Sequence, residues 1–362
     1  GDGTRLAQGE QADFYVEFSE GIDFTGTPTL TIRRKSDANA SVNCASCVDG
    51  ATKAYFDYTV QDGDYSPHLD YVNHNSLSGT MKDYAGNALA NCAGCSGTLP
   101  SSPASFGDQA SGSAVANKSL SNALTGGSLE IDGNDPADFS VGAVVTQGNN
   151  VVSGKWNSTN QNVQVTIPAS ALSNDPTLEA GTIQLRVEAD GSFENIGSAY
   201  TIQNSDLGSL KNLTVTKANV EAITGYSQDD ELTWNAIITD RAGNATTGTA
   251  SGTTLDVDVS SPTVDAITST AGYYKLNESV NIVVSFTENI AITGTPQLVM
   301  KTDNSPGSGT ATIDKSGLSG DNVTFAYTVG STHYSTALDY ATPADDLKLN
   351  SGTITDAAGN NA

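Results

Sequence analysis

Asp83-Tyr-Ala-Gly-Asn87 returns in this chain as Asp240-Arg-Ala-Gly-Asn244 and again as Asp356-Ala-Ala-Gly-Asn360. Aspartate and asparagine side chains bond to nearby backbone amides, and glycine supplies a positive φ. Each copy therefore predicts a tight hairpin ahead of a last strand. The copies divide 362 residues into three parts, which fits the usual domain size of roughly 100–200 residues. The pentapeptide thus predicts three modules that share one turn.

The composition favours an all-β chain. It includes 36 Gly and only 2 Met, and almost no stretch repeats helix-forming residues at helical spacing. The 41 acidic and 16 basic side chains leave a net charge of −25, which repels nucleic acid and anionic membranes and makes cations the expected ionic partners. No run approaches the roughly 18 apolar residues of a membrane span. The sequence begins at Gly1 without a signal peptide, so we expect a processed chain or an excised segment.

Internal repetition is the most informative pattern. Residues 12, 14, 16 and 18 are apolar at alternate positions, which predicts a strand with one face in a core. At an offset of 286 − 18 = 268, the same pattern recurs at 280–286, and Thr25-Gly-Thr-Pro28 recurs as Thr293-Gly-Thr-Pro296. The sequence therefore predicts two copies of one module, at 1–107 and 263–362, flanking a different one.

The central region, 108–262, shares only the pentapeptide and its exit with the outer modules. Its length favours either one enlarged sandwich with extra strands or two fused domains, and we expect the first. Leu232, Trp234, Ala236 and Ile238 alternate along one strand, which predicts a central strand with Trp234 in the core. The run from Leu255 to Asp265 predicts a strand that passes directly into the third module as a short, stiff joint.

The ordered set of motifs resembles the immunoglobulin-like or cadherin-like tandem repeats of very large bacterial surface proteins, adhesins among them. The set includes Phe18-Ser-Glu20 with Phe286-Thr-Glu288, Leu69-Asp-Tyr71 with Leu338-Asp-Tyr340, and the Asp-x-Ala-Gly-Asn pentapeptides. The resemblance implies tandem antiparallel β-sandwiches of immunoglobulin-like fold, an extracellular or cell-surface location, a stalk or adhesive role, frequent calcium dependence and no enzymatic activity.

The two outer modules differ at their ends. The third module opens with the strand-like 263–268, which has no counterpart before Gly1, and the first module continues past its pentapeptide while the sequence stops at Ala362. A sandwich that lacks an edge strand exposes unpaired backbone. Two interpretations follow: the segment is cut from a longer array, or identical chains supply the missing strands and form a filament by strand donation.

Acidic clusters are the candidate calcium ligands, because calcium takes carboxylate and carbonyl oxygens. A solvated acidic edge and a purely structural turn are the alternatives for each cluster. Glu20 with Asp70, and Glu288 with Asp339, recur at matching positions. The candidates at the boundary between the second and third modules are Asp256, Asp258 and Asp265; a second cluster consists of Asp132, Asn134 and Asp135; and the pentapeptides contribute Asp83, Asp240 and Asp356.

Four cysteines form two Cys-x-x-Cys pairs, Cys44 with Cys47 and Cys92 with Cys95. The pattern fits a four-thiolate zinc site, but in an exported protein disulfides are expected instead, and zinc is the weaker alternative. The third module has no cysteine, so the pairs are local to the first module. Sequence leaves all three disulfide connectivities open.

Catalytic signatures are missing from the sequence. His68, His74 and His333 do not recur at matching positions, and no nucleophile elbow, zinc-protease motif or phosphate-binding loop is present. We therefore expect no enzyme. The expected function is a structural or adhesive segment of a secreted or surface-exposed fibre, stalk or filament. The alternatives are a strand-donating filament subunit and a carbohydrate- or host-binding module that presents Tyr65, Tyr84, Tyr273 and Tyr334.

Overall fold

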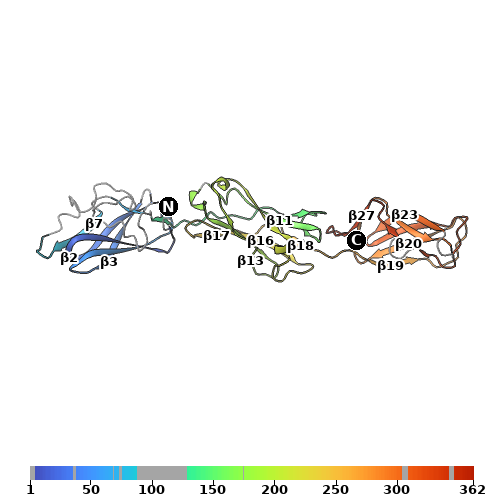
Figure 1. Cartoon of the computed structure of the whole chain (residues 1–362), viewed down its shortest axis with the longest axis horizontal. Helices are drawn as coiled ribbons and strands as arrows, with labels where there is room; N and C mark the ends of the chain where they lie inside the picture. The colour runs from blue at the N-terminus through green and yellow to red at the C-terminus, as the bar shows by residue number, and fades with distance from the viewer. Residues whose placement is uncertain are drawn as a thin grey trace.

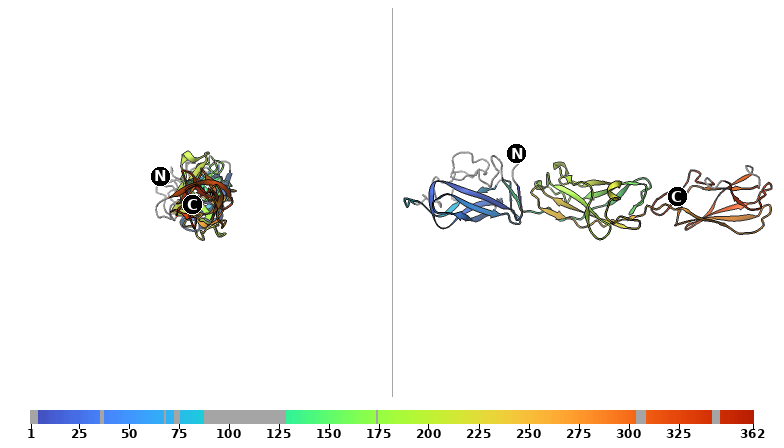
Figure 2. Two further views of the ribbon diagram at one scale, coloured as in Figure 1. Left: turned by 90° about the vertical axis from the view of Figure 1, so that its right-hand side faces the viewer. Right: turned by 60° about the horizontal axis from the view of Figure 1, so that its bottom comes forward.

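The computed structural model consists of three β-sandwiches arranged end to end (Figure 1). It describes residues 5–35, 38–67, 69–72, 76–87, 129–173, 175–303, 309–341 and 346–362. Seen along the long axis, the three sandwiches superimpose on one another, whereas the side view shows a rod (Figure 2). No helix in the described residues is long and apolar enough to cross a membrane. The chain is an all-β protein built from tandem immunoglobulin-like sandwiches, as the sequence predicts.

The first sandwich is built around one long, bent strand, β2, which takes part in both halves of its main sheet. That sheet has the order β3-β4-β2-β6, with β7 also paired to β2, and a smaller sheet has the order β1-β8-β5. The strands are β1 (Arg5–Ala7), β2 (Gln11–Lys35), β3 (Ala38–Cys47), β4 (Ala51–Thr59), β5 (Tyr65–Ser66), β6 (Asp70–Tyr71), β7 (Leu77–Asp83) and β8 (Glu130–Asp132).

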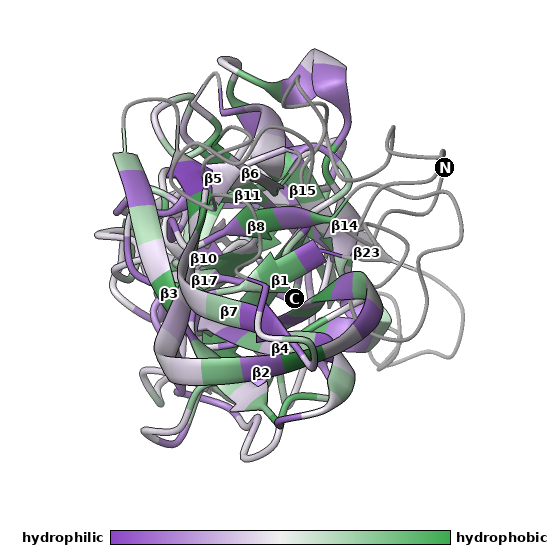
Figure 3. Cartoon of the chain, turned by 90° about the vertical axis from the view of Figure 1, so that its left-hand side faces the viewer, coloured by the Kyte–Doolittle hydropathy of each residue, from purple (hydrophilic) through white to green (hydrophobic). Residues whose placement is uncertain are grey.

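Alternation along β2 places its apolar residues in the first core. Ala12, Phe14, Val16 and Phe18 are all buried, which confirms the predicted face. Figure 3 shows the resulting bands of hydrophobic and hydrophilic residues along β2. In the third module the matching residues Val280, Ile282, Val284 and Phe286 are buried in the same way. The repeat in sequence is therefore a repeat in packing.

The first sandwich takes its closing strand from a distant part of the chain. β8 pairs in parallel with β1, and Leu129 and Ile131 belong to the first hydrophobic core. The predicted boundary at residues 107 and 108 lies outside the described residues. Because 129–132 complete the first sheet and core, the first module extends to Asp132, and the central module cannot begin at 108.

The central sandwich has one continuous core that runs from Phe139 to Val257, which favours one enlarged sandwich over two fused domains. Leu232, Trp234, Ala236 and Ile238 are fully buried, as predicted. Its elements are β9 (Val144–Gly148), β10 (Lys155–Trp156), β11 (Asn160–Ile167), η3 (Pro176–Leu178), β12 (Thr182–Glu188), β13 (Glu194–Asn195), β14 (Tyr200–Thr201), η4 (Asn204–Asp206), β15 (Lys211–Thr216), α1 (Lys217–Val220), β16 (Glu231–Thr239), β17 (Ala245–Thr247) and β18 (Leu255–Val257).

Its strands form two sheets, β10-β18-β16-β12-β13 and β15-β11-β9. The additional length of this module lies in the short elements between β12 and β16, which include β13, β14 and α1. β18 ends the module, and Val259 still packs against its core. The next strand begins at Val264, so only a few residues join the second and third modules.

The third sandwich repeats the first with β2 divided into three strands. β20, β21 and β22 lie at the positions of residues 11–18, 23–25 and 29–33 of β2, at the constant offset of 268. The elements are β19 (Val264–Ser269), β20 (Ser279–Phe286), β21 (Ala291–Thr293), β22 (Gln297–Lys301), β23 (Thr310–Ser319), β24 (Asn322–Thr328), β25 (Asp339–Tyr340), β26 (Leu347–Lys348) and β27 (Thr353–Thr355).

The two outer sandwiches differ at one edge, as the sequence suggests. β19 pairs with β20 along residues 282–286, while β24 pairs with the other side of β20. The matching residues 14–17 of β2 pair with β4 on one side, and among the described residues no strand pairs with the other side. The opening strand of the third module therefore has no described counterpart in the first.

Candidate metal centre at the module joints

Each pentapeptide folds as a turn closed by its own first and last residues. In the central module, Asp240 Oδ1 accepts hydrogen bonds from the backbone N–H groups of Ala242, Gly243 and Asn244 at 2.7–3.0 Å. Asn244 Nδ2 donates to the other oxygen, Asp240 Oδ2, at 2.8 Å. The turn connects β16 to β17, which pair as antiparallel strands, so the predicted hairpin is confirmed here.

The bonds between the first and last residues of the turn recur in the other two copies. Asn360 N donates to Asp356 Oδ1 at 2.8 Å and Asn87 N donates to Asp83 Oδ1 at 2.8 Å. At Asp83 the hydrogen bond from the Asn87 side chain, followed by backbone N–H bonds, lowers the carboxyl pKa. Donors that point at the ionised carboxylate favour its charged form.

The asparagine that ends the turn also binds the preceding module. Asn360 Nδ2 donates to the backbone carbonyl oxygen of Asp258 at 2.8 Å, and its Oδ1 accepts from Ser158 N at 2.8 Å.

Two asparagines of the central module also bind the turn. Asn157 and Asn150 donate to the carbonyls of Ala358 and Gly359 at 2.6 and 2.9 Å. A Cβ at position 359 would lie 2.6 Å from the Asn150 carbonyl oxygen, so only glycine permits this approach.

The first joint repeats this clamp, which we define as the pentapeptide asparagine bonded to two backbone groups of the preceding module. Asn244 Nδ2 donates to the carbonyl oxygen of Asp132 at 2.8 Å, and Asn244 Oδ1 accepts from Gln8 N at 2.9 Å. Asp132 is the last residue of β8, and Asp258 directly follows β18, so each lies at the end of a strand that closes its module. The clamp therefore ties the end of one sandwich to the turn of the next.

Three carboxylates converge beside the clamp at the second joint. One oxygen each from Asp258, Glu288 and Asp356 lies within 4.8 Å of the others. Asp258 follows β18, Glu288 follows β20, and Asp356 begins the pentapeptide, so the second and third modules both contribute. Burial, and then the charges of Asp356 and Asp258, raise the pKa of Glu288. None of the three takes part in an ion pair among the described residues.

The first joint holds a further buried carboxylate, of which only one oxygen accepts a hydrogen bond within the described part of the chain. Asp132 is fully buried, and its Oδ1 accepts from Asn134 N at 3.1 Å, while its Oδ2 has no hydrogen-bond partner among the described residues. The nearby Thr177 hydroxyl donates to Asp175 instead. Burial is the main cause that raises the pKa of Asp132, and the Asp240 charge adds to it. A buried, unpaired carboxylate oxygen is costly unless it protonates or binds a cation.

The two joints balance charge differently. At the first joint Arg241, inside the pentapeptide, pairs with Glu130, which also accepts from Arg5 Nε at 3.0 Å. At the second joint the residue that matches Arg241 is Ala357, and Glu288 adds a further negative charge. The second joint is therefore the more acidic and the stronger candidate for a cation.

The structure brings together only some of the predicted ligands. Asp258 meets Asp356, and Asp132 lies near Asp240, but Asp256 forms an ion pair with Lys155 at 2.8 Å. The remaining candidates lie apart from both groups or serve as donors: Asp265 is exposed on β19, Asp135 is exposed, Asn134 donates to Asp132, and Asp83 stays within the first module.

For Glu288 and the clamp asparagines, the structure shows partners other than those that the sequence predicts. Recurrence singled out Glu288 but associated it with Asp339, which is exposed on β25, rather than with Asp356. The clamp asparagines were recognised only as turn residues. A turn alone does not require asparagine at its last position. The repetition of asparagine at the fifth position of every pentapeptide is therefore the sequence signal for a second role.

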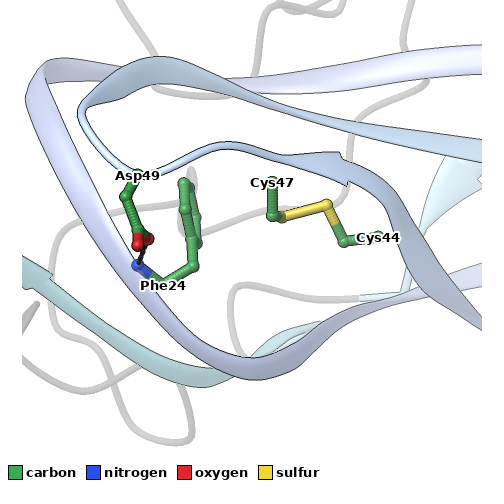
Figure 4. The surroundings of a disulfide bond; sticks show 4 residues. All are labelled: Phe24, Cys44, Cys47 and Asp49. Atoms are coloured by element: carbon green, nitrogen blue, oxygen red, sulfur yellow. Dashed lines mark hydrogen bonds between the residues drawn. A yellow bond between two sulfur atoms is a disulfide. The ribbon is translucent and has the colours of Figure 1, made fainter.

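The first Cys-x-x-Cys pair is a disulfide. Cys44 and Cys47 are joined near the end of β3, and both pack against the first core close to Phe24 (Figure 4). Asp49, in the turn after β3, accepts from Phe24 N of β2 at 2.8 Å and ties this turn to β2 beside the disulfide. Cys92 and Cys95 lie outside the described residues. Sulfur atoms bonded to each other are not thiolate ligands, so Cys44 and Cys47 offer no zinc site in this form.

The predicted tyrosine surface does not come together. Tyr65 lies in β5 and Tyr84 in the first pentapeptide, whereas Tyr273 and Tyr334 belong to the third module.

His333, which is among the described residues, has a structural role: its Nδ1 lies 2.8 Å from Tyr327 Oη and accepts from Gly330 N. The joints gather carboxylate and carbonyl oxygens, which are the ligand types that hard cations take.

Comparison with known proteins adds little to this geometry. No protein-family model matches the sequence, and no curated protein matches it. Solved structures that resemble the chain include the FN1–FN3 domains of chicken CNTN1, at 10% identity over 95% of each chain with a TM-score of 0.22. A marsupial T cell receptor shows 7% identity over 93% of this chain and 96% of that chain, with a TM-score of 0.33. At such scores the superpositions carry no argument, and the fold rests on the strand pairing described above.

Proposed function

We propose that this chain is a rod-forming structural segment of an extracellular bacterial surface protein, stiffened by calcium at its joints. The observation that carries the proposal is the convergence of Asp258, Glu288 and Asp356 from two modules beside the clamp. A modular, non-catalytic segment of immunoglobulin-like sandwiches fits this geometry. The bacterial surface location is supported by the resemblance of the repeat motifs.

A cation at the second joint would act mechanically. The three carboxylates repel one another when the joint is straight, so without a cation they favour conformations in which the modules separate. Calcium would turn this repulsion into shared coordination across the joint, because it accepts six to eight oxygens in flexible geometry. The Asp132 and Asp240 carboxylates give the first joint a smaller version of the same site.

Calcium titration of the full chain tests the proposal. Isothermal calorimetry should detect binding, and small-angle scattering should show a narrower range of end-to-end distances with calcium than with a chelator. The Asp258→Asn variant should lose most of the second-joint response, while Asp265→Asn, an exposed neighbour, should behave like the parent chain. Scattering curves and melting curves that calcium leaves unchanged would refute the stiffening role.

A further inference from the structure

The first and central modules are each closed by a short strand with the same pattern. Leu129-Glu-Ile-Asp132 and Leu255-Asp-Val-Asp258 alternate apolar and acidic residues. β8 lies between β1, to which it is parallel, and β5, to which it is antiparallel. β18 likewise lies between β10, in parallel, and β16, antiparallel. The apolar residues of both closing strands are almost fully buried.

We call the space between the two neighbours of a closing strand the slot. Hydrogen bonds show which residues of the third module border the matching space. Gly9 N donates to Val60 O at 2.9 Å, and at the matching positions Asn277 N donates to Val329 O at 2.9 Å. This register places 273–275 at the position of β1. Tyr327 Oη bonds His333 where Tyr58 Oη bonds Asp64, which places 334 and 335 at the position of β5.

The third module therefore has both neighbours of a closing strand. Among the described residues no strand pairs between 273–275 and 334–335. Tyr273 and Tyr334 are exposed to 106% and 68%. The slot is thus defined by two segments whose counterparts in the first module enclose β8.

Exposure of core positions marks the same slot. Leu69 and Tyr71 are fully buried in the first module, but their matches in the third, Leu338 and Tyr340, are exposed to 37% and 38%. The residues are identical in type and in position, so the difference comes from what covers them. In the first module, the Leu129 carbonyl accepts from Leu69 N at 2.8 Å, which places the entry to the closing strand directly over this position.

A cleft opens beside the uncovered residues. It has a volume of about 240 Å³, and Tyr340, Leu298 and Leu347 form part of its wall. Their counterparts in the first module, Tyr71, Leu30 and Leu77, are fully buried. A cleft lined mainly by apolar side chains, beside two segments that no strand pairs among the described residues, favours the addition of a β-strand, which supplies main-chain bonds and apolar side chains together.

We propose that the slot of the third module binds an added β-strand of the pattern apolar-acidic-apolar-Asp, carried directly ahead of another module of this kind. The strand runs parallel to 273–275 and antiparallel to 334–335. Its two apolar side chains cover the region of Leu338 and Tyr340, as Leu129 and Ile131 cover the matching region of the first module.

The choice of this occupant follows from the two filled slots. In both, the closing strand leads within a few residues into a module whose pentapeptide asparagine binds the strand's terminal aspartate. The first module offers the matching surface to such a strand: Asn87 is exposed, and Glu20 and Asp83 stand where Glu288 and Asp356 stand in the third module. The module that follows an incoming strand would therefore bind the end of that strand through its own pentapeptide asparagine, as at the two joints of this chain. The proposal does not depend on calcium.

A synthetic peptide tests the slot in the full chain. The probe is Leu-Glu-Ile-Asp-Gly-Asn, the sequence of 129–134, and the control peptide has serine in place of both apolar residues. Hydrogen exchange followed by mass spectrometry should show at least about tenfold slower exchange in 273–276 and 334–340 with the probe. The matching segments 5–8 and 65–71 should not change, because their slot is filled.

Three outcomes would overturn the proposal. One is unchanged exchange at millimolar probe, and a second is equal protection by the control peptide. The third is dimerisation of the chain alone, with protection of 334–340 that grows with protein concentration, because the occupant would then be a second copy.

A variant at the slot supplies the control. Leu338→Asp, which alters an exposed position, should fold normally and lose the protection that the probe gives.

Discussion

Asn360 of the third module donates to the backbone carbonyl of Asp258 at 2.8 Å, and Asn244 makes the same bond to Asp132 one joint earlier. One residue thus closes a turn inside its own module and holds the end of the module before it. Because the bond always runs from a pentapeptide to a preceding closing strand, the rod has a direction. Each joint uses the asparagine of a pentapeptide, so the same contact recurs between successive modules.

Replacing the clamp asparagine should loosen the joint. Asn360→Ala leaves the Asp258 carbonyl and Asp356 Oδ2 without a donor, and the loss of such partly buried bonds costs about 1–3 kcal/mol. Small-angle scattering should show a broader distribution of lengths, and hydrogen exchange should rise at 356–361.

The matched control is Asn87→Ala. Among the described residues, the Asn87 side chain bonds only Asp83, within the same turn. We expect a local effect on that turn and no change in the length distribution. An equally broad distribution in both variants would show that the clamp does not orient the modules.

Glu288→Gln separates a ligand role from a turn role. Calcium sites tune affinity through the number of charged ligands, so removal of one of three carboxylates should weaken binding at the second joint at least about tenfold. Glu20→Gln changes the same position of the first module and should leave that affinity unchanged. Calorimetry on both variants makes the comparison, and equal losses would contradict a site at the joint.

The same glutamate predicts how the joint responds to pH. Burial and the neighbouring aspartates raise the folded pKa of Glu288 above its ordinary 4.5, so its protonated form is the one that the fold favours. In chelator, the joint should be more stable below pH 4.5 and should lose that contribution as the pH rises through the raised pKa. Melting curves of the parent chain and Glu288→Gln should differ least at the acid end of this window. A constant difference across it would argue against the raised pKa.

The disulfide should stabilise only the first module. Cys44 and Cys47 close a very short loop, for which loop-closure entropy gives about 2 kcal/mol. The Cys44→Ser, Cys47→Ser variant should therefore show faster hydrogen exchange in β3 and β4. Tryptophan fluorescence should not change, because Trp156 and Trp234 both lie in the central core. A shift of the fluorescence transition would show that the modules unfold together.

Sequence reasoning succeeded where the pattern is local. Alternation placed Phe14, Ile282 and Trp234 in their cores, because strand periodicity alone decides which face is buried. It failed where a contact joins distant segments. The strand at 130–132 returns to the first sheet across more than a hundred residues from β1, and Glu288 meets Asp258 only through the joint. Neither pairing leaves a mark at fixed spacing, so the module boundary and the ligand set required the structure.

Leu69 and Leu338 test directly how much a closing strand contributes. Leu69 is fully buried beneath the entry to β8, so Leu69→Ala should cost about 2–5 kcal/mol through lost burial and the cavity that remains. Leu338 is 37% exposed, and Leu338→Ala should cost roughly 1 kcal/mol or less. Hydrogen exchange can assign each loss to its own module in the full chain. When the six-residue strand peptide occupies the slot, Leu338 becomes buried, and the cost of its truncation should rise toward that of Leu69. If the two costs were equal without the peptide, the third module would already be closed, and the slot would not exist in solution.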